Sequence, residues 1–105
     1  MSAGKIELPP LTVDFLAGEA TLDGIRIPLT LKEPQLLGCF ALFAGQRLSF
    51  NETYRRAWSE LSPGASGTVK AHVSNLRRKM KFDEGGWFEL SSPGKNEYIF
   101  SKVRY

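Results

Sequence analysis

The apolar positions change their spacing along the chain, and this pattern predicts the order of the secondary-structure elements. Within residues 11–29, apolar residues alternate with polar ones in short runs such as "LTVDFLAG" and "IRIPL". Alternation with a period of two is typical of strands that bury one face. Asp23-Gly24, a strong tight-turn pair, separates two of these runs, and Pro28 favours an edge strand. We therefore predict a small antiparallel sheet over residues 11–29, preceded by a flexible lead-in over residues 1–10.

Residues 30–82 change to the longer spacing of helices. "TLKE" at Thr30 and "SFNE" at Ser49 have the spacing of a capping box, in which the hydroxyl and the Glu side chain each accept from the other residue's backbone amide. The first helix then runs through "QLLGCFALFA" and should end near Gly45. Because this helix is apolar around most of its circumference, we expect it to lie buried at the centre of a three-helix core over residues 30–82.

The third helix, predicted over residues 68–81, has two distinct faces. At 100° per residue its apolar residues fall in one narrow arc, the core side: Val69, Val73, Leu76 and Met80. The opposite side holds Ala71, Ser74, Asn75 and Arg78. The borders between these faces hold Lys70, Arg77 and Lys81 on one side and His72 and Lys79 on the other. The outward side is thus small and polar in its middle and basic along its edges.

After Phe82, two aromatic-rich runs predict a β-hairpin. "WFELS" and "EYIFS" are separated by "SPGKN", which places the hairpin tip near Gly94-Lys95. This hairpin, over residues 86–101, completes the order of a sheet, three helices and a terminal hairpin. The predicted fold class is therefore α+β, in one domain over residues 1–105, because this length supports one compact core and is too short for two.

Composition excludes several classes of function. A single cysteine forms no internal disulfide, and one cysteine with one histidine is too few for a zinc site of about four ligands. The sequence has no phosphate-binding glycine loop and no nucleophile beside a base, so we predict no enzymatic activity, no catalytic residue and no cofactor. It has no long apolar run and no basic-then-apolar leader, which favours a cytoplasmic protein without a membrane contact.

The positive charge of the chain is concentrated in one segment. The net charge is +3, but residues 61–82 carry five basic and no acidic groups, while the segments on either side are each at −1. Such a cluster favours an anionic partner. Short polar residues between two basic borders suit the major groove of double-stranded DNA, where the borders meet phosphates and the backbone approaches the bases. A basic helix exposed to water without a partner is the alternative.

Several stretches resemble one known family. "TVKAHVSNLRRKM", preceded by "AW" at the end of a helix and followed by an aromatic hairpin, is similar to the recognition helix of the OmpR/PhoB family of bacterial response regulators, which reads roughly R-T-V-D-V-H-I-x-x-L-R-K-K-L. "LTLKEPQLL" resembles the start of that family's first helix, and "LSFNE…AW" resembles its second. The resemblance extends from Leu11 to Phe100. It implies a winged helix-turn-helix effector domain of a bacterial, cytoplasmic two-component system.

The resemblance also implies sequence-specific binding to double-stranded DNA for transcription control. By position, the base-reading residues would be Lys70, Ala71 and Asn75, and the last two have the chemistry to contact a thymine methyl and an adenine edge. The phosphate-binding residues would be Trp58, Thr68, His72, Ser74, Arg77 and Arg78, with Lys95 as the nearest cation in the wing. Further implied partners are RNA polymerase, through the loop at residues 59–67, and a second copy of the chain on tandem half-sites.

The chain departs from the family pattern at several places. Gly67 stands where Arg is usual, which loses one phosphate contact, and Lys70 replaces a frequent Asp. The wing lacks its usual Arg, and Glu97 would repel phosphate. These departures motivate a second hypothesis, a winged-helix protein-interaction module that has lost DNA binding. RNA binding comes last, because exposed aromatic residues are not interleaved with the basic ones.

Overall fold

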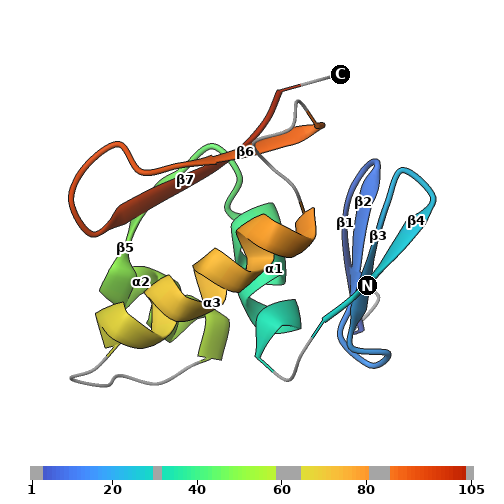
Figure 1. The fold of residues 1–105 in the computed structure, drawn as a ribbon, viewed down its shortest axis with the longest axis horizontal. Coiled ribbons are helices and arrows are strands. Elements are labelled where there is room, and N and C mark those ends of the chain that lie inside the picture. Colours follow the sequence, from blue (N-terminus) through green and yellow to red (C-terminus); the bar gives the residue numbers. More distant parts are fainter. Residues whose placement is uncertain (1–3, 30–31, 59–64, 81–85, 104–105) are drawn as a thin grey trace.

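The chain begins with a four-stranded antiparallel sheet. The computed structural model describes residues 4–29, 32–58, 65–80 and 86–103. The strands of this amino-terminal sheet are β1 (Lys5–Leu8), β2 (Leu11–Asp14), β3 (Glu19–Leu22) and β4 (Ile25–Pro28), and they lie in the order β1-β2-β3-β4. Figure 1 shows this sheet to the right of the three helices.

The turn between β3 and β4 has the predicted geometry. Asp23 and Gly24 both have positive φ angles, 51° and 81°, as tight hairpin turns of this kind require. β4 lies at the edge of the sheet, so the edge position predicted from Pro28 is confirmed.

The prediction of a lead-in over residues 1–10 is corrected by β1. Ile6 is paired with Val13 and Leu8 with Leu11, so β1 adds a strand to the outer side of β2. Ile6 and Leu8 also pack against the buried core. Their alternation covers only four residues, which is too short for a sequence pattern to separate a strand from a tail. Residues 5–8 therefore belong to the sheet.

Three helices form the centre of the domain. They are α1 (Glu33–Leu42), α2 (Phe50–Trp58) and α3 (Ala65–Met80). α1 is buried along most of its length, as its apolar sequence predicted, and Gly45 follows its end with a left-handed φ of 85°. α3 begins at Ala65 and not at the predicted residue 68. The intervening "ASG" favours a turn by composition, and the helix includes it nevertheless.

Gly38 allows the amino-terminal sheet to pack directly on α1. A Cβ atom at this position would lie 2.6 Å from Cζ of Phe15 and 3.3 Å from Cδ1 of Ile6. The first distance is well inside van der Waals contact, so the helix backbone and the Phe15 ring approach closely only because Gly38 has no side chain. This contact holds the sheet against the helical core.

The carboxy-terminal hairpin is part of a three-stranded sheet. Its strands are β6 (Phe88–Ser91) and β7 (Glu97–Lys102), and β5 (Arg47–Ser49) joins them in the order β5-β7-β6. β5 was not predicted, because three residues between two helices carry no readable period. Backbone amides on either side of β5 fix it to the hairpin: Gly45 donates to Phe100 O and Phe50 donates to Asn96 O, both at 2.8 Å.

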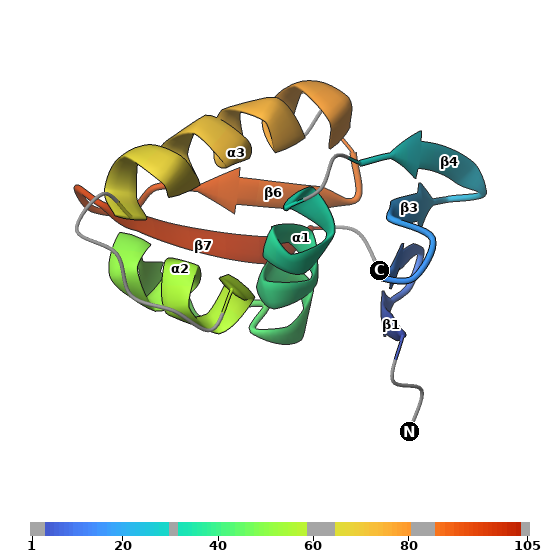
Figure 2. The ribbon, with the colours of Figure 1, turned by 90° about the horizontal axis from the view of Figure 1, so that it is seen from below.

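We call the loop and turn between β6 and β7, residues 92–96, the wing tip. Figures 1 and 2 both show it at the same end of the molecule as the start of α3, and the amino-terminal sheet at the opposite end. Aromatic rings join the hairpin to the helices: Phe100 stacks on Phe88 at 5.1 Å and on Phe40 of α1 at 6.0 Å. The hairpin and α3 are thus held on one continuous core.

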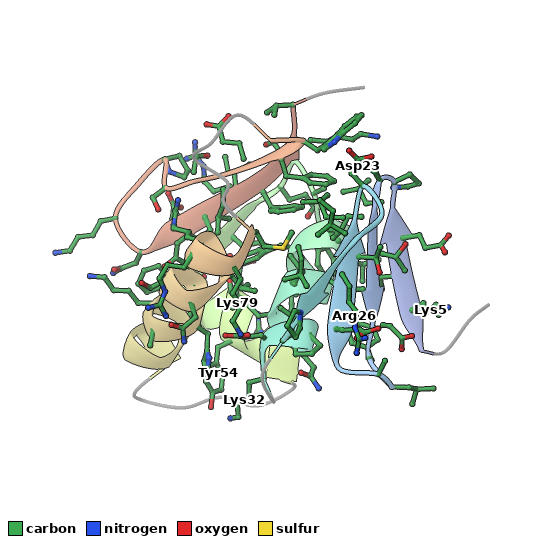
Figure 3. All side chains as sticks on the ribbon, turned by 45° about the vertical axis from the view of Figure 1, so that its right-hand side comes forward. Lys5, Asp23, Arg26, Lys32, Tyr54 and Lys79 are labelled. Atoms are coloured by element: carbon green, nitrogen blue, oxygen red, sulfur yellow. The ribbon has the colours of Figure 1, made fainter. Side chains whose placement is uncertain are left out.

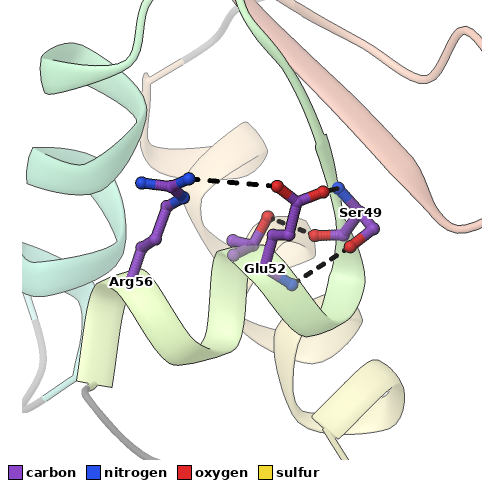
Figure 4. Close-up of polar contacts among 4 residues, drawn as sticks. Ser49, Glu52 and Arg56 are labelled. Atoms are coloured by element: carbon purple, nitrogen blue, oxygen red, sulfur yellow. Dashed lines mark hydrogen bonds and ion pairs between the residues drawn. The ribbon is translucent and has the colours of Figure 1, made fainter.

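α2 begins with the predicted capping box, which Figure 4 shows. The Glu52 amide donates to Ser49 Oγ at 3.1 Å, and the Ser49 amide donates to Glu52 Oε1 at 3.3 Å. Arg56 lies 4.0 Å from Glu52 Oε2, so the same carboxylate also faces the next turn. The other capping box was predicted to begin the first helix at Thr30, which lies outside the described residues; α1 itself begins at Glu33, with Lys32 at its N-cap position.

Candidate nucleic-acid interface

α3 exposes the side that its sequence predicted to face outward. The predicted core residues are all buried: Val69, Val73, Leu76 and Met80. Lys70, Ala71, Ser74 and Arg78 are exposed, and His72, Asn75, Arg77 and Lys79 are half-buried. Because the described strands leave this side open, a partner can reach it.

In the middle of the outward side, Asn75 and Arg78 form one polar unit. The Arg78 guanidinium donates from Nη2 to Oδ1 of Asn75, which lies one helical turn away. This bond orients the amide so that the remaining N–H groups of both side chains are available to acceptors on a partner. Ala71, one turn before Asn75, is exposed, and its short side chain lets a partner approach the helix backbone.

Facing the wing, α3 lines a cleft of about 240 Å³. Lys70, Val73, Ser74 and Arg77 line it from the helix, and Ser92 and Tyr98 line it from the hairpin. We call it the wing cleft. Among the residues that the structure describes, its lining contains two cations and no carboxylate. Ser92 and Tyr98 were not identified as site residues from the sequence, because only the packing of the hairpin on α3 brings them to the basic edge.

The Tyr98 side chain is buried, and the Arg77 guanidinium acts on its hydroxyl electrostatically. Burial raises the pKa of the Tyr98 hydroxyl above its ordinary value of 10.0, and the nearby Arg77 guanidinium opposes this shift. Tyr98 also stacks on Phe50 at 4.9 Å, which fixes its ring. The hydroxyl is therefore neutral at physiological pH.

On its other edge, α3 forms an ion pair with α1. Lys79 Nζ lies 2.6 Å from Glu33 Oε1, and the Glu33 side chain is 1% exposed whereas that of Lys79 is 31% exposed. The two residues are 46 positions apart, so the helix sequence alone gave no sign of this partner. Lys79 therefore contributes to the fold, and its charge is directed toward Glu33.

Lys95 is exposed at the wing tip, and Glu97, the first residue of β7, is paired with a cation. Glu97 Oε1 lies 4.0 Å from Arg47 Nη1 in β5. The carboxylate also lies so close to Gly94 that a Cβ atom there would collide with Oε1. The sequence predicted that Glu97 would repel phosphate, and this ion pair reduces the repulsion.

Several predicted site residues lie outside the described part of the structure. These are the side chains of Trp58 and Thr68 and the loop residues 59–64, which include most of the segment predicted to contact RNA polymerase. Their predicted roles stay predictions.

Other kinds of site are not found among the described residues. No group of three or more His, Cys, Asp or Glu side chains could hold a metal ion there. Cys39 is buried, and burial raises the pKa of its thiol to about 11, so it is a poor nucleophile at neutral pH. Within the same residues, none of the helices has the length and apolar character needed to span a bilayer.

Three helices with an exposed basic side on the third, followed by a hairpin that packs beside it, define a winged helix-turn-helix domain. The family described as "Transcriptional regulatory protein, C terminal" matches residues 24–87, which is more than half of the chain. The chain therefore belongs to this family of OmpR/PhoB-type DNA-binding domains. The predicted family and fold are confirmed, and the family is one of transcription regulators and not of enzymes.

Curated relatives are response regulators and sensory transduction proteins. The chain is 31% identical over 83 residues to sensory transduction protein RegX3 of Mycobacterium leprae, covering 79% of this chain and 42% of the relative. It is 27% identical over 77 residues to response regulator SaeR of Staphylococcus epidermidis, covering 73% of this chain and 34% of the relative. The chain thus spans between about a third and two fifths of the length of these relatives.

Solved structures share the fold over nearly the whole chain. The DNA-binding domain of CpxR from E. coli superposes with a TM-score of 0.70 at 27% identity, covering 94% of this chain and 97% of that one. The DNA-binding domain of Klebsiella pneumoniae RstA, in complex with the RstA box, gives a TM-score of 0.73 at 21% identity, covering 92% and 96%. At this lower identity the likeness to RstA shows the fold alone.

Proposed function

We propose that this domain binds specific sequences of double-stranded DNA to control transcription, with α3 in the major groove and the wing tip beside the adjacent minor groove. The observation that carries the proposal is the outward side of α3, which is exposed and has small polar residues between basic edges. The CpxR domain, at 27% identity, is described as a DNA-binding domain, which supports the same function here.

In this proposal, Ala71 and Asn75 face the bases. Ala71 is short enough to let the helix approach and has a methyl group for a thymine methyl, while the Asn75 amide matches the edge of adenine. The Arg78–Asn75 bond orients the amide before DNA binds. On binding, Arg78 keeps that bond and directs its remaining N–H groups to a phosphate.

The phosphate contacts surround these base contacts. His72, Ser74, Arg77 and Arg78 of α3 are exposed or half-buried where phosphates would lie, and Lys95 projects from the wing tip. Thr68 and Trp58 complete the predicted set. Lys70 was predicted to read a base, but it lines the wing cleft beside Arg77.

Two further partners remain part of the proposal. A second copy of the chain would bind beside the first on tandem half-sites, and the segment 59–67 would contact RNA polymerase. A DNA-protection pattern with two adjacent footprints of equal size would support the first, and a single footprint at saturation would contradict it.

The test begins with selection of bound sequences from a random duplex pool, followed by titration of the selected site at several salt concentrations. We expect log K to fall by about 0.9 per neutralised phosphate for each log unit of salt. Asn75→Ala should relax the preferred sequence, whereas Arg77→Ala should weaken binding to all duplexes alike.

Lys5→Gln serves as a charge-matched control, because Lys5 lies on the amino-terminal sheet, far from α3 in Figure 3. This variant should bind like the original chain. Absence of binding to any duplex at low salt, together with co-purification of an acidic protein, would favour the protein-interaction module. Uniform losses in both the Asn75 and Arg77 variants would refute the separation of base and phosphate contacts.

A further inference from the structure

Lys70, Ser74 and Arg77 form one stripe along α3 that faces the wing. They are spaced by four and three residues, so they lie above one another on the helix. All three line the wing cleft, together with Ser92 from the wing tip and Tyr98 from β7. Lys70 therefore belongs with Arg77 at the wing-facing edge and not with Ala71 and Asn75 on the outward side.

The lining of the wing cleft matches a single phosphate group. Lys70 and Arg77 supply two cations, Ser74, Ser92 and Tyr98 supply hydroxyls, and Val73 supplies an apolar floor. The volume of about 240 Å³ is several times the roughly 30 Å³ that one water occupies, so a phosphate with bound waters fits. Two cations without a carboxylate between them repel each other, and an anion placed between them removes that repulsion.

The cleft also lies where a DNA strand would pass. If α3 enters the major groove and the wing tip approaches the minor groove, the sugar–phosphate backbone between the two grooves runs between α3 and the hairpin. Both walls of the cleft are held on the core, since Val73 and Tyr98 are buried. The phosphate ligands are thus fixed in position before DNA binds.

We propose that the wing cleft binds one backbone phosphate of double-stranded DNA, held by Lys70 and Arg77 from α3 and by Ser92 from the wing tip. Lys70 then adds affinity and fixes the position of the domain on the duplex, and it reads no base. This inference rests on the proposed function and changes the role that sequence position gave to Lys70.

A base-reading residue and a phosphate ligand give different results when removed. Loss of a base contact relaxes the preference at one position, whereas loss of a phosphate contact weakens all sequences alike and lowers the salt slope by about 0.9. Lys70→Gln removes the charge at an exposed position, so the fold is retained, and thermal unfolding checks this. Lys5→Gln makes the same change far from α3.

The experiment combines sequence selection with neutral backbone linkages. Sites are first selected with the original chain and with Lys70→Gln. The selected duplex is then made with a methylphosphonate, which lacks the phosphate charge, at each backbone position in turn. Binding of each duplex is measured by fluorescence anisotropy for the original chain, Lys70→Gln, Arg77→Gln, Ser92→Ala and Lys5→Gln.

We expect Lys70→Gln to select the same site, to bind it about 10-fold more weakly and to lower the salt slope by about 0.9. One methylphosphonate position should weaken the original chain, and it should weaken Lys70→Gln and Arg77→Gln by a smaller factor, because each variant keeps only one of the two cations at that phosphate. The methylphosphonate at that same position should also weaken Ser92→Ala less than it weakens the original chain.

Three outcomes would overturn the inference. A changed base preference in Lys70→Gln would make Lys70 a base-reading residue. Full additivity between Lys70→Gln and every methylphosphonate would show that no single phosphate contacts Lys70. If Lys70→Gln and Arg77→Gln were each non-additive with a methylphosphonate at a different position, the two residues would bind different phosphates and would share no site. If the original chain binds no duplex at all, the proposed function itself fails, which is a separate result.

Discussion

The two edges of α3 both carry lysine, but their surroundings give these lysines different roles. On the wing-facing edge, Lys70 and Arg77 line an open cleft, and no carboxylate lies among the described residues of its lining. On the opposite edge, Lys79 forms a 2.6 Å ion pair with the buried Glu33 of α1. A lysine beside a buried carboxylate stabilises the fold, whereas a lysine at an open cleft is available to an anion. The comparison separates structural from binding charges on one helix.

The largest expected effect tests the structural edge. Lys79→Met leaves the Glu33 carboxylate in the core without its lysine, and we expect the free energy of unfolding to fall by about 2–4 kcal/mol. Lys70→Met should change it by less than about 0.5 kcal/mol, because Lys70 is exposed. Urea denaturation of both variants measures the difference. Equal stability of the two variants would remove the distinction between the edges.

A double variant at Lys79 and Glu33 tests whether the buried carboxylate causes this loss of stability. Glu33→Met combined with Lys79→Met replaces the ion pair by two apolar side chains of similar length. We expect the double variant to be more stable than Lys79→Met alone, because the buried carboxylate that lost its lysine is also gone. A double variant that is less stable than the single one would mean that Glu33 stabilises the fold mainly through other contacts.

The next effect tests the binding edge. Arg77→Gln should weaken binding to the selected duplex about 10-fold and lower the salt slope by about 0.9, because one phosphate contact is lost. Lys79→Met, measured at a temperature where it is folded, should leave the salt slope unchanged. Titrations at four salt concentrations distinguish the two. A lower salt slope in Lys79→Met would show that Lys79 contacts a DNA phosphate.

A smaller effect is expected at the wing tip. Glu97 is paired with Arg47, so its charge is partly neutralised before DNA binds. Glu97→Gln should therefore change DNA affinity by less than about threefold and stability by less than about 1 kcal/mol, as for exposed ion pairs. Fluorescence anisotropy and urea denaturation measure both. A gain well above threefold would show that Glu97 repels the phosphate backbone despite Arg47.

The smallest effect concerns the tyrosine of the wing cleft. Because burial raises the pKa of Tyr98 above 10.0, the folded state favours the neutral hydroxyl, and stability is lost as the pH rises past the ordinary tyrosine value. Tyr98→Phe cannot ionise, so its free energy of unfolding should fall less between pH 10 and pH 11. Identical pH profiles for the two proteins would mean that Tyr98 ionises equally easily in both states.

Local signals in the sequence predicted much of the fold. The Ser49 capping box, the turn at Asp23-Gly24 and the edge position of β4 were all confirmed. Each is a contact within a few residues or the direct consequence of one residue's backbone preference. The strands β1 and β5 were missed, because four and three residues are too short to show a period, and each forms only when another strand is present to pair with it.

Part of the candidate site, too, could be predicted from local sequence signals, and part could not. Periodicity alone separated the buried stripe of α3 from its outward side, and the structure confirms this for every described residue of the stripe. The role of each cation on that helix was not readable from the helix itself. Glu33 lies far along the chain from Lys79, and Ser92 and Tyr98 come from the hairpin.

The sequence by itself determined the capping box that begins α2, which side of α3 is buried and where positive charge gathers, because these follow from residue type and spacing along one segment. Only the tertiary structure decided which of those charges are already paired and which face an open cleft. That difference depends on distances between segments remote in the chain, and the strength of a charge interaction depends on such distances and on burial.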